Sequence, residues 1–303
     1  MKEFPWEELQ ERLDYLKNVL REHRITPEKG YGLQYMIEET EAVLRQEKKD
    51  LRQVDLMHET IKSIKGLQSL LILTESLKTL DKRQINYHSQ LMNCRTGNID
   101  YGEREQKQKD IYYKDFELEI FIAAQLADKT DLKVILPQDQ GPFDIIVESD
   151  FAIQVKHPSN IENAFDRLGK FQRDLAQSDL KGIFAVGHED AFNYGDRIQF
   201  PDEGDFDEYF HTIAIQIDKF GMSVLARFEK LENIVGFIAT TTMFVLIGLD
   251  SSAGMNLRRF SNSFVIENRV AGERYSQVTK ALSVFNRKLR HITFEDRRII
   301  VSK

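Results

Sequence analysis

The stretch GPFDIIVESDFAIQVKHP at residues 141–158 contains three polar residues whose types could do chemistry together: Asp144, Gln154 and Lys156. An aspartate is a hard oxygen ligand for Mg²⁺ or Mn²⁺, and a glutamine offers a carbonyl oxygen. A lysine is a compact cation that could orient an attacking water or stabilise negative charge developing on a phosphate. Because a metal ion activates its bound water and neutralises phosphate oxygens, these residue types together fit metal-dependent phosphodiester hydrolysis. The alternative is polar decoration of solvent-exposed strands.

The spacing of the three residues predicts that they meet. The stretch reads as two strands, 143–149 and 151–156, around a tight turn. Side chains two residues apart share a strand face, and neighbouring strands lie about 4.8 Å apart. An acid at the start of the first strand can therefore face an amide and a lysine at the end of the second.

The flanking residues predict the frame that would hold this hairpin. A helix with a wide apolar face is expected over 112–128, followed by a short strand over 132–137. After the hairpin, an amphipathic helix is expected over 160–177 and a buried strand over 182–187. The expected order of elements is therefore α-β-β-β-α-β.

This order resembles the PD-(D/E)xK, or restriction-endonuclease-like, superfamily of nucleases. The resemblance rests on Pro142-Phe143-Asp144 and on Gln154-Val155-Lys156, and it covers about residues 112–187. Most members have Asp or Glu at the position of Gln154, and the Q-x-K form resembles the Mrr-type restriction nucleases. The resemblance implies an α/β core with a mixed central sheet, Mg²⁺ (or Mn²⁺) as cofactor, and DNA as a substrate in preference to RNA. It also implies a role in bacterial defence or DNA repair.

The resemblance further implies that an acid on the preceding helix completes the metal site. The segment FELE supplies Glu117 and Glu119, which lie about 200° apart around a helix, so that only one can face the sheet edge. We expect Glu117, because family members often show Phe-Glu at this point, and keep Glu119 as the alternate. The expected catalytic set is therefore Asp144, Gln154, Lys156 and Glu117, with the metal held by Asp144, Gln154 and the helix glutamate.

The remaining sequence predicts further units around this core. Residues 1–93 are read as a helical domain for dimerisation, target binding or partner binding, and residues 94–110 as a linker. Residues 111–303 are read as the PD-(D/E)xK-like nuclease domain, with a basic helix expected over 270–291 near its C-terminal end. Additional strands are expected at 211–217 and, as two strands with a bend at the threonines, at 234–249.

Charge is distributed unevenly along the chain. Residues 111–200 contain 9 Lys and Arg against 16 Asp and Glu, whereas residues 256–303 contain 11 against 4. An acid-rich block beside a basic block fits a metal site next to a phosphate-binding surface, although two solvated faces would give the same counts. The residues expected to bind nucleic acid are Arg258, Arg259, Arg287, Lys288 and Arg290.

Composition limits the class of protein. The chain has 303 residues with 30% charged and 41% hydrophobic, and its one cysteine, Cys94, excludes an internal disulfide framework. The N-terminus lacks the apolar core of a signal peptide, and the run at 234–249 is shorter than the roughly 20 residues of a membrane span. We expect a cytoplasmic protein that does not contact membranes.

Two other functions fit the same sequence. Gln154 replaces a charged ligand, so the chain could be a catalytically inactive nuclease fold that binds nucleic acid or a partner. Alternatively, the helical half could make it a scaffold protein, with self-association through the N-terminal helices.

Overall fold

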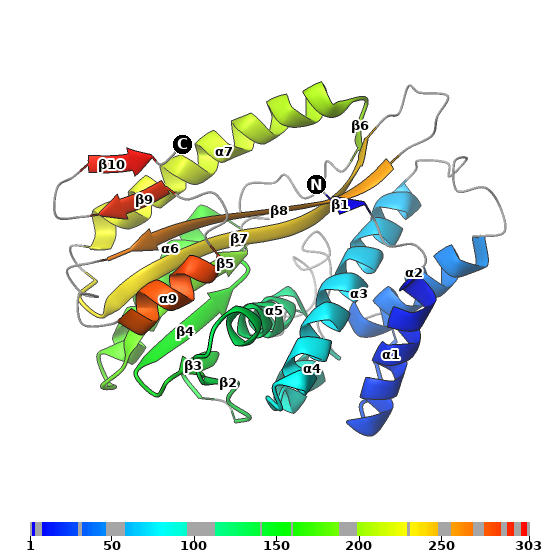
Figure 1. Ribbon diagram of the computed structural model, residues 1–303, viewed down its shortest axis with the longest axis horizontal. Coiled ribbons are helices and arrows are strands. Elements are labelled where there is room, and N and C mark those ends of the chain that lie inside the picture. Colours follow the sequence, from blue (N-terminus) through cyan, green and yellow to red (C-terminus); the bar gives the residue numbers. More distant parts are fainter. Residues whose placement is uncertain are drawn as a thin grey trace.

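A computed structural model of the protein describes the following residues: 2–3, 8–29, 32–46, 58–95, 113–139, 141–158, 160–187, 199–228, 231–247, 256–268, 276–285, 290–293 and 298–301. They form a mixed α/β structure in which helices cover both faces of an open sheet (Figure 1).

The sheet contains both parallel and antiparallel neighbours. From one edge to the other, its strands are β1 (Lys2–Glu3), β8 (Asn256–Glu267), β7 (Ile234–Ile247), β5 (Lys181–Gly187), β4 (Phe151–Lys156), β3 (Ile145–Val147) and β2 (Val134–Ile135). Strand β5 runs parallel to β4 and β7, whereas the other neighbours on this path are antiparallel. Strand β6 (Gln199–Phe200) pairs with β7 off the path, and β9 (Arg290–Thr293) pairs with β10 (Arg298–Val301).

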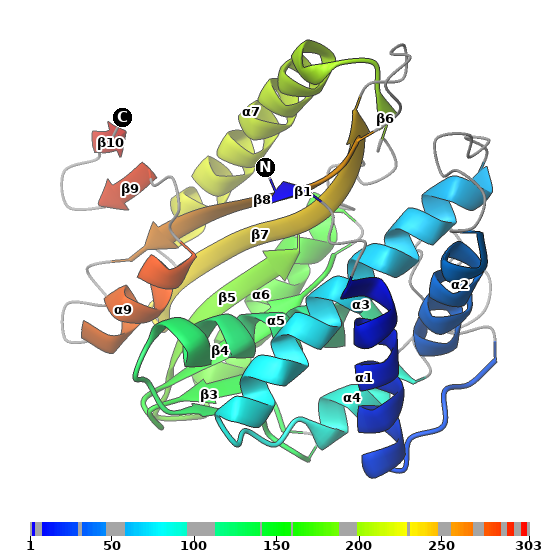
Figure 2. The ribbon, with the colours of Figure 1, turned by 45° about the vertical axis from the view of Figure 1, so that its right-hand side comes forward.

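The helices fall into layers on either side of the sheet. They are α1 (Leu9–Glu22), α2 (Gly32–Gln46), α3 (His58–Lys82), α4 (His88–Cys94), α5 (Tyr113–Lys129), α6 (Ile161–Leu175), α7 (Glu203–Phe228) and α9 (Ser276–Val284). Helices α5, α3 and α9 lie on one side of the sheet, and α6 and α7 on the other (Figures 1 and 2). In the part of the chain that the structure describes, no helix is long and apolar enough to cross a membrane.

Alternation along the central strands explains the two layers. On β4, Ile153 and Val155 face the α5 side, and Ala152 faces the α6 side. On β5, Ile183 faces α5 and Phe184 faces α6. Side chains that alternate on a pleated strand must go to opposite faces, so these strands are buried on both sides and carry apolar residues almost throughout.

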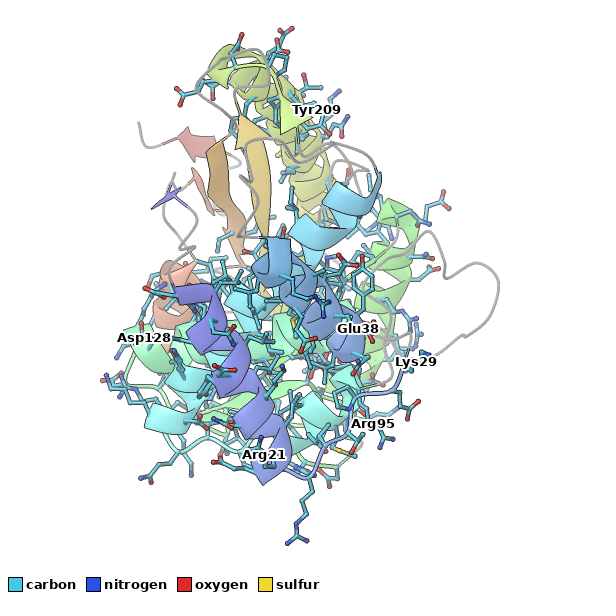
Figure 3. All side chains as sticks on the ribbon, turned by 90° about the vertical axis from the view of Figure 1, so that its right-hand side faces the viewer. Arg21, Lys29, Glu38, Arg95, Asp128 and Tyr209 are labelled. Carbon is cyan, nitrogen blue, oxygen red and sulfur yellow. The ribbon has the colours of Figure 1, made fainter. Side chains whose placement is uncertain are left out.

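The N-terminal helices share a hydrophobic core with the sheet. One continuous cluster contains Leu13 of α1, Leu70 of α3, Ile120 of α5 and Ile153 of β4. Figure 3 looks onto the outer side of α1 and α2, where charged side chains such as Glu38 are exposed. The apolar stripes of these helices therefore pack inward against the sheet layer. Most of the expected linker, 96–110, lies outside the described residues, and the domain boundaries stay a prediction.

The expected order α-β-β-β-α-β is confirmed as α5, β2, β3, β4, α6 and β5. The strand predicted over 211–217 is wrong, because this segment lies within α7. The buried apolar residues Ile213, Ile217, Phe220 and Val224 recur every three or four residues, which is the helical period. The local alternation in HTIAIQI suggested a strand, but the longer pattern decides the structure.

Two further predictions differ from the structure near the C-terminus. The two strands with a bend expected at 234–249 form one strand, β7, which pairs with β8 from Gly236 to Ile247 and has no break at Thr240 to Thr242. Of the basic helix expected over 270–291, α9 covers Ser276–Val284, and Arg290 begins β9. Residues 270–275 and 286–289 lie outside the described residues.

Close packing of α6 onto β5 depends on one glycine. A β-carbon at Gly182 would overlap with the side chains of Leu175 and Phe171 of α6. At Gly169, on α6 itself, a β-carbon would meet only Arg173, at an ordinary contact distance of 3.8 Å. The sheet therefore needs glycine at 182, and the helix does not need it at 169.

We predict that Gly182→Ala lowers the free energy of unfolding by about 1–3 kcal/mol, because the added methyl group overpacks the interface between α6 and β5. Gly169→Ala is the matched control and should raise it by about 0.5–1 kcal/mol, since alanine favours the helix. Urea unfolding followed by circular dichroism measures both. Equal effects of the two substitutions would contradict this account of the packing.

Candidate active site

A tight turn sets the register of the hairpin. Val147 pairs with Phe151, and the Asp150 N–H donates to the Val147 carbonyl at 3.1 Å. Glu148 and Ser149 adopt φ angles of 55° and 63°, the left-handed conformation that a tight hairpin requires. This register places Asp144, the residue before β3, opposite Gln154, the fourth residue of β4.

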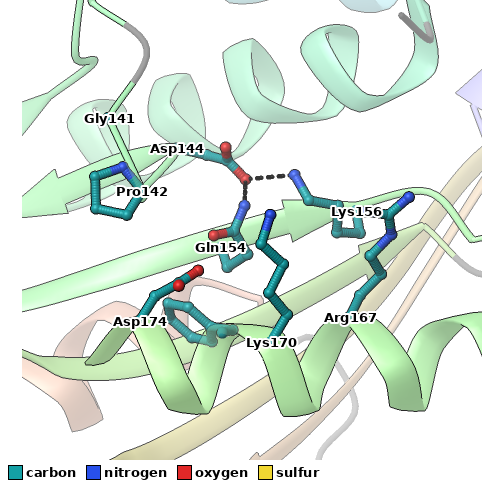
Figure 4. Close-up of a pocket in the computed structure, with 9 residues that line it drawn as sticks. Gly141, Pro142, Asp144, Gln154, Lys156, Arg167, Lys170 and Asp174 are labelled. Atoms are coloured by element: carbon teal, nitrogen blue, oxygen red, sulfur yellow. Dashed lines mark hydrogen bonds and ion pairs between the residues drawn. The ribbon is translucent and has the colours of Figure 1, made fainter. Parts of the chain in front are cut away.

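That register places Asp144 against the end of β4. Its Oδ2 accepts hydrogen bonds from the Gln154 side-chain amide, from the Val155 N–H at 2.7 Å and from the Lys156 ammonium at 3.0 Å (Figure 4). Strand β3 begins only at Ile145, so the Asp144 side chain takes over as acceptor where the strand pairing stops. The structure thus brings together the three residues that the sequence singled out in this stretch.

The preferred helix glutamate, Glu117, points away from this cluster. Its Oε2 accepts from the Lys114 ammonium at 2.7 Å and from the Ser69 hydroxyl at 3.3 Å. Ser69 belongs to α3, so Glu117 lies at the contact between α5 and α3. The structure does not bring Glu117 to the Asp144 cluster.

The alternate, Glu119, lies on the site side of α5. Burial raises the pKa of its carboxyl well above the usual value, and the negative charges of Asp144 and Asp115 raise it further, against the opposing effect of Lys156. Glu119 is only 3% exposed. Glu119 is buried and interacts with two other acids. Of the two helix glutamates, it is therefore the one that could share a cation with Asp144.

Asp115 is a site residue that the sequence reading missed. Its Oδ1 accepts the His157 N–H at 2.5 Å, directly after β4 ends. Burial raises the pKa of Asp115, and the charges of Lys156 and His157 oppose that shift. Asp115 and Glu119 are four residues apart on α5 and therefore share a helix face. That spacing was the signal available in the sequence.

Lys156 is held as a cation. Burial would lower the pKa of its ammonium, but Asp144, Asp115 and Glu119 together raise it above the usual value for lysine. The Asp144–Lys156 pair is partly shielded from water, with side chains 18% and 23% exposed. Lys156 is therefore suited to electrostatic stabilisation and water positioning, and unsuited to removing a proton at neutral pH.

A cavity of about 250 Å³ opens beside this cluster. One wall is the hairpin edge, and the other is α6 (Figure 4). The lining residues are Gly141, Pro142, Asp144, Gln154, Lys156, Arg167, Lys170, Phe171 and Asp174. A small polar ligand in this cavity would contact both Asp144, just before β3, and the cations of α6.

The residues predicted to bind nucleic acid lie elsewhere in the chain or outside the described residues. Arg258 and Arg259 belong to β8, and Arg290 begins β9. Arg287 and Lys288 lie outside the described residues. Their role in binding stays a prediction.

The site fits a hard divalent cation in its chemistry. Asp115, Glu119 and Asp144 outnumber Lys156, and burial first, then the charges of Asp144 and Asp115, raise the pKa of Glu119. Within the described residues, no three His, Cys, Asp or Glu side chains are grouped so that they could hold a metal ion by themselves. Mg²⁺ commonly binds to only one or two carboxylates, with waters and substrate phosphates as its other ligands. Asp144 and Glu119 could supply those two carboxylates.

Comparisons with protein-family models, with curated proteins and with solved structures return no match to this chain.

We predict that Glu117→Ala lowers the free energy of unfolding by about 3 kcal/mol, because it leaves the Lys114 ammonium buried without its carboxylate. Glu208→Ala, at an exposed position of α7, should change it by no more than about 0.5 kcal/mol. Chemical unfolding compares the two variants. A Glu117→Ala protein as stable as the control would show that the contact between α5 and α3 does not depend on this pair.

We predict that Glu119→Gln becomes more stable relative to wild type as pH rises. The raised pKa means that the folded protein holds a proton on Glu119 that the unfolded chain releases near pH 4.3. Above that pH, ionisation disfavours the folded state by up to about 1.4 kcal/mol per pH unit, until the folded pKa is reached.

Glutamine does not ionise, so the Glu119→Gln protein does not lose this free energy of unfolding as pH rises. Urea unfolding in EDTA at pH 4.5, 6.0 and 7.5 would measure the difference between the two proteins. A difference that stays constant with pH would contradict the predicted shift.

Proposed function

We propose that the protein is a metal-dependent nuclease that hydrolyses phosphodiester bonds in DNA. The observation that carries the proposal is the convergence of Asp144, Gln154 and Lys156 at one edge of the hairpin, next to Glu119 and a cavity that α6 lines with cations. The element order around the site supports a core of the PD-(D/E)xK type. DNA as substrate, and a role in bacterial defence or DNA repair, follow from that resemblance.

Each residue has a role that its geometry supports. Asp144 and Glu119 would hold Mg²⁺ or Mn²⁺, with Gln154 and the backbone beside it as further oxygen donors. The bound ion would lower the pKa of a water and neutralise phosphate oxygens. Asp144 is fixed for this task by the hydrogen bonds from Val155 and Lys156.

The proposed role of Lys156 is to position the attacking water and to stabilise negative charge. Its ammonium would donate to the attacking water oxygen or to a non-bridging phosphate oxygen, where negative charge increases in the transition state. Hydrolysis forms one P–O bond from water and breaks the P–O bond to the leaving sugar oxygen, which takes up a proton. Asp115 holds the end of β4 through the His157 N–H and so keeps Lys156 in place.

A second function is favoured by one detail of the site. Gln154 directs its amide nitrogen to Asp144, so that it donates a hydrogen bond where most family members place a charged metal ligand. A protein of this kind could bind DNA or a partner without cleaving it. Calorimetric titration with Mn²⁺ separates the two functions: binding that Asp144→Asn abolishes favours the nuclease, and absence of binding favours the inactive fold.

We predict that wild type cleaves DNA with Mg²⁺ or Mn²⁺, and that Asp144→Asn and Lys156→Met lower the rate at least about 100-fold, because each removes a charge that stabilises the transition state. Lys133→Met, which changes an exposed lysine near β2, is the matched control and should leave cleavage unchanged. The measurement follows a labelled DNA on a denaturing gel, with EDTA as the metal-free control. No cleavage by wild type, or full cleavage by both site variants, would refute the nuclease proposal.

A further inference from the structure

Helix α6 presents four residues to the cavity along a single face. Arg167, Lys170, Phe171 and Asp174 all line it, and their spacing of three and four residues puts them on one side of a helix. Arg167 and Lys170 are exposed at the surface of the helix, whereas Phe171 is buried beneath them. Figure 4 shows the Lys170 side chain extending toward Gln154, and Arg167 lying beside Lys156.

The rotation of α6 is fixed by its ends and its apolar side. The helix begins at the Asn160 cap, whose side chain accepts the Asn163 N–H at 2.8 Å. Its apolar side packs on the sheet through Ala164, Leu168 and Leu175. Since this side is held against the strands, the cations beside it are directed to the edge where Asp144 lies.

The charges around the cavity are not balanced against one another. Lys156 pairs with Asp144 on the hairpin side. Among the residues that the structure describes, neither Arg167 nor Lys170 has an ion-pair partner, and Asp174 is the one acid that α6 adds to the lining. Two cations that face a cavity without an ion-pair partner are suited to bind phosphate oxygens. A guanidinium can bind two such oxygens side by side, and an ammonium acts as a point charge.

We propose that Arg167 and Lys170 form a phosphate-binding site that holds the DNA backbone across the cavity, beside the phosphate that is cleaved. The inference rests on the proposed nuclease function for the identity of the ligand. It adds two binding residues on α6 that the family motif does not contain. Asp174 opposes binding at the same site, because its carboxylate lies on the same helix face and repels phosphate.

The test measures DNA binding without cleavage. A fluorescein-labelled DNA oligonucleotide is titrated with the full chain in EDTA, and anisotropy gives the affinity at several salt concentrations. The double variant R167Q/K170Q should bind at least about tenfold more weakly than wild type. When log affinity is plotted against log salt concentration, its slope should be shallower than that of wild type by about 1.5, because two phosphate contacts are lost.

Two further variants separate this site from general charge effects. Arg173→Gln removes an exposed cation from the same helix, outside the cavity lining, and should change affinity less than twofold. Asp174→Asn should bind more tightly than wild type, since it removes the opposing charge, and a merely structural role of α6 would not produce that gain.

The result can be told apart from failure of the nuclease proposal. If R167Q/K170Q loses affinity and Arg173→Gln does not, the phosphate site stands even where wild type proves unable to cleave. If R167Q/K170Q and Arg173→Gln bind equally well, the phosphate site is refuted even where wild type cleaves normally. Absence of DNA binding by wild type would also refute it.

Discussion

The hydrogen bonds that converge on Asp144 Oδ2 hold the site together. Strands β3 and β4 stop pairing at this point, and the backbone N–H of Val155 would lack an acceptor without the carboxylate. Because the same oxygen also receives Lys156, the end of the hairpin and the position of the cation are fixed by one side chain. A buried N–H and a partly buried ammonium each need an acceptor, so these bonds stabilise the local fold as well as the charge arrangement.

The two faces of the sheet then bring opposite charge to that edge. Helix α5 packs on one face and supplies Asp115 and Glu119, which interact with Lys156. Helix α6 packs on the other face and directs Arg167 and Lys170 to the cavity. The strand edge therefore lies between two acids of α5 and two cations of α6, and the proposed metal and phosphate sites depend on this arrangement.

The sequence predicted the part of the site that depends on strand geometry. Asp144, Gln154 and Lys156 were placed correctly relative to one another, because alternation on a strand leaves only two faces to choose between.

The helix glutamate could not be predicted in this way. Glu117 and Glu119 lie on opposite sides of α5, and the choice between them depends on how the helix is rotated against its neighbours. Ser69 lies on α3, far away in the sequence, and its hydroxyl donates a hydrogen bond to Glu117, which therefore points away from the cavity. Asp115 was missed for the same reason, since its role depends on the His157 backbone. The strand prediction at 211–217 was wrong because these seven residues were read without the helical period of the residues around them.

The amide at Gln154 is consistent with the charges around it. A carboxylate there would lie beside Asp144, in a cluster where burial and neighbouring acids already raise the pKa of Glu119 well above its usual value. Adding another acid would increase repulsion around one lysine, whereas the amide donates to Asp144 and reduces it. In this arrangement the further acids near Asp144 come from α5, and β4 contributes an amide. In the same site, α5 supplies the buried Glu119 and the partly buried Asp115, and Gln154 contributes the hydrogen bond that keeps Asp144 oriented.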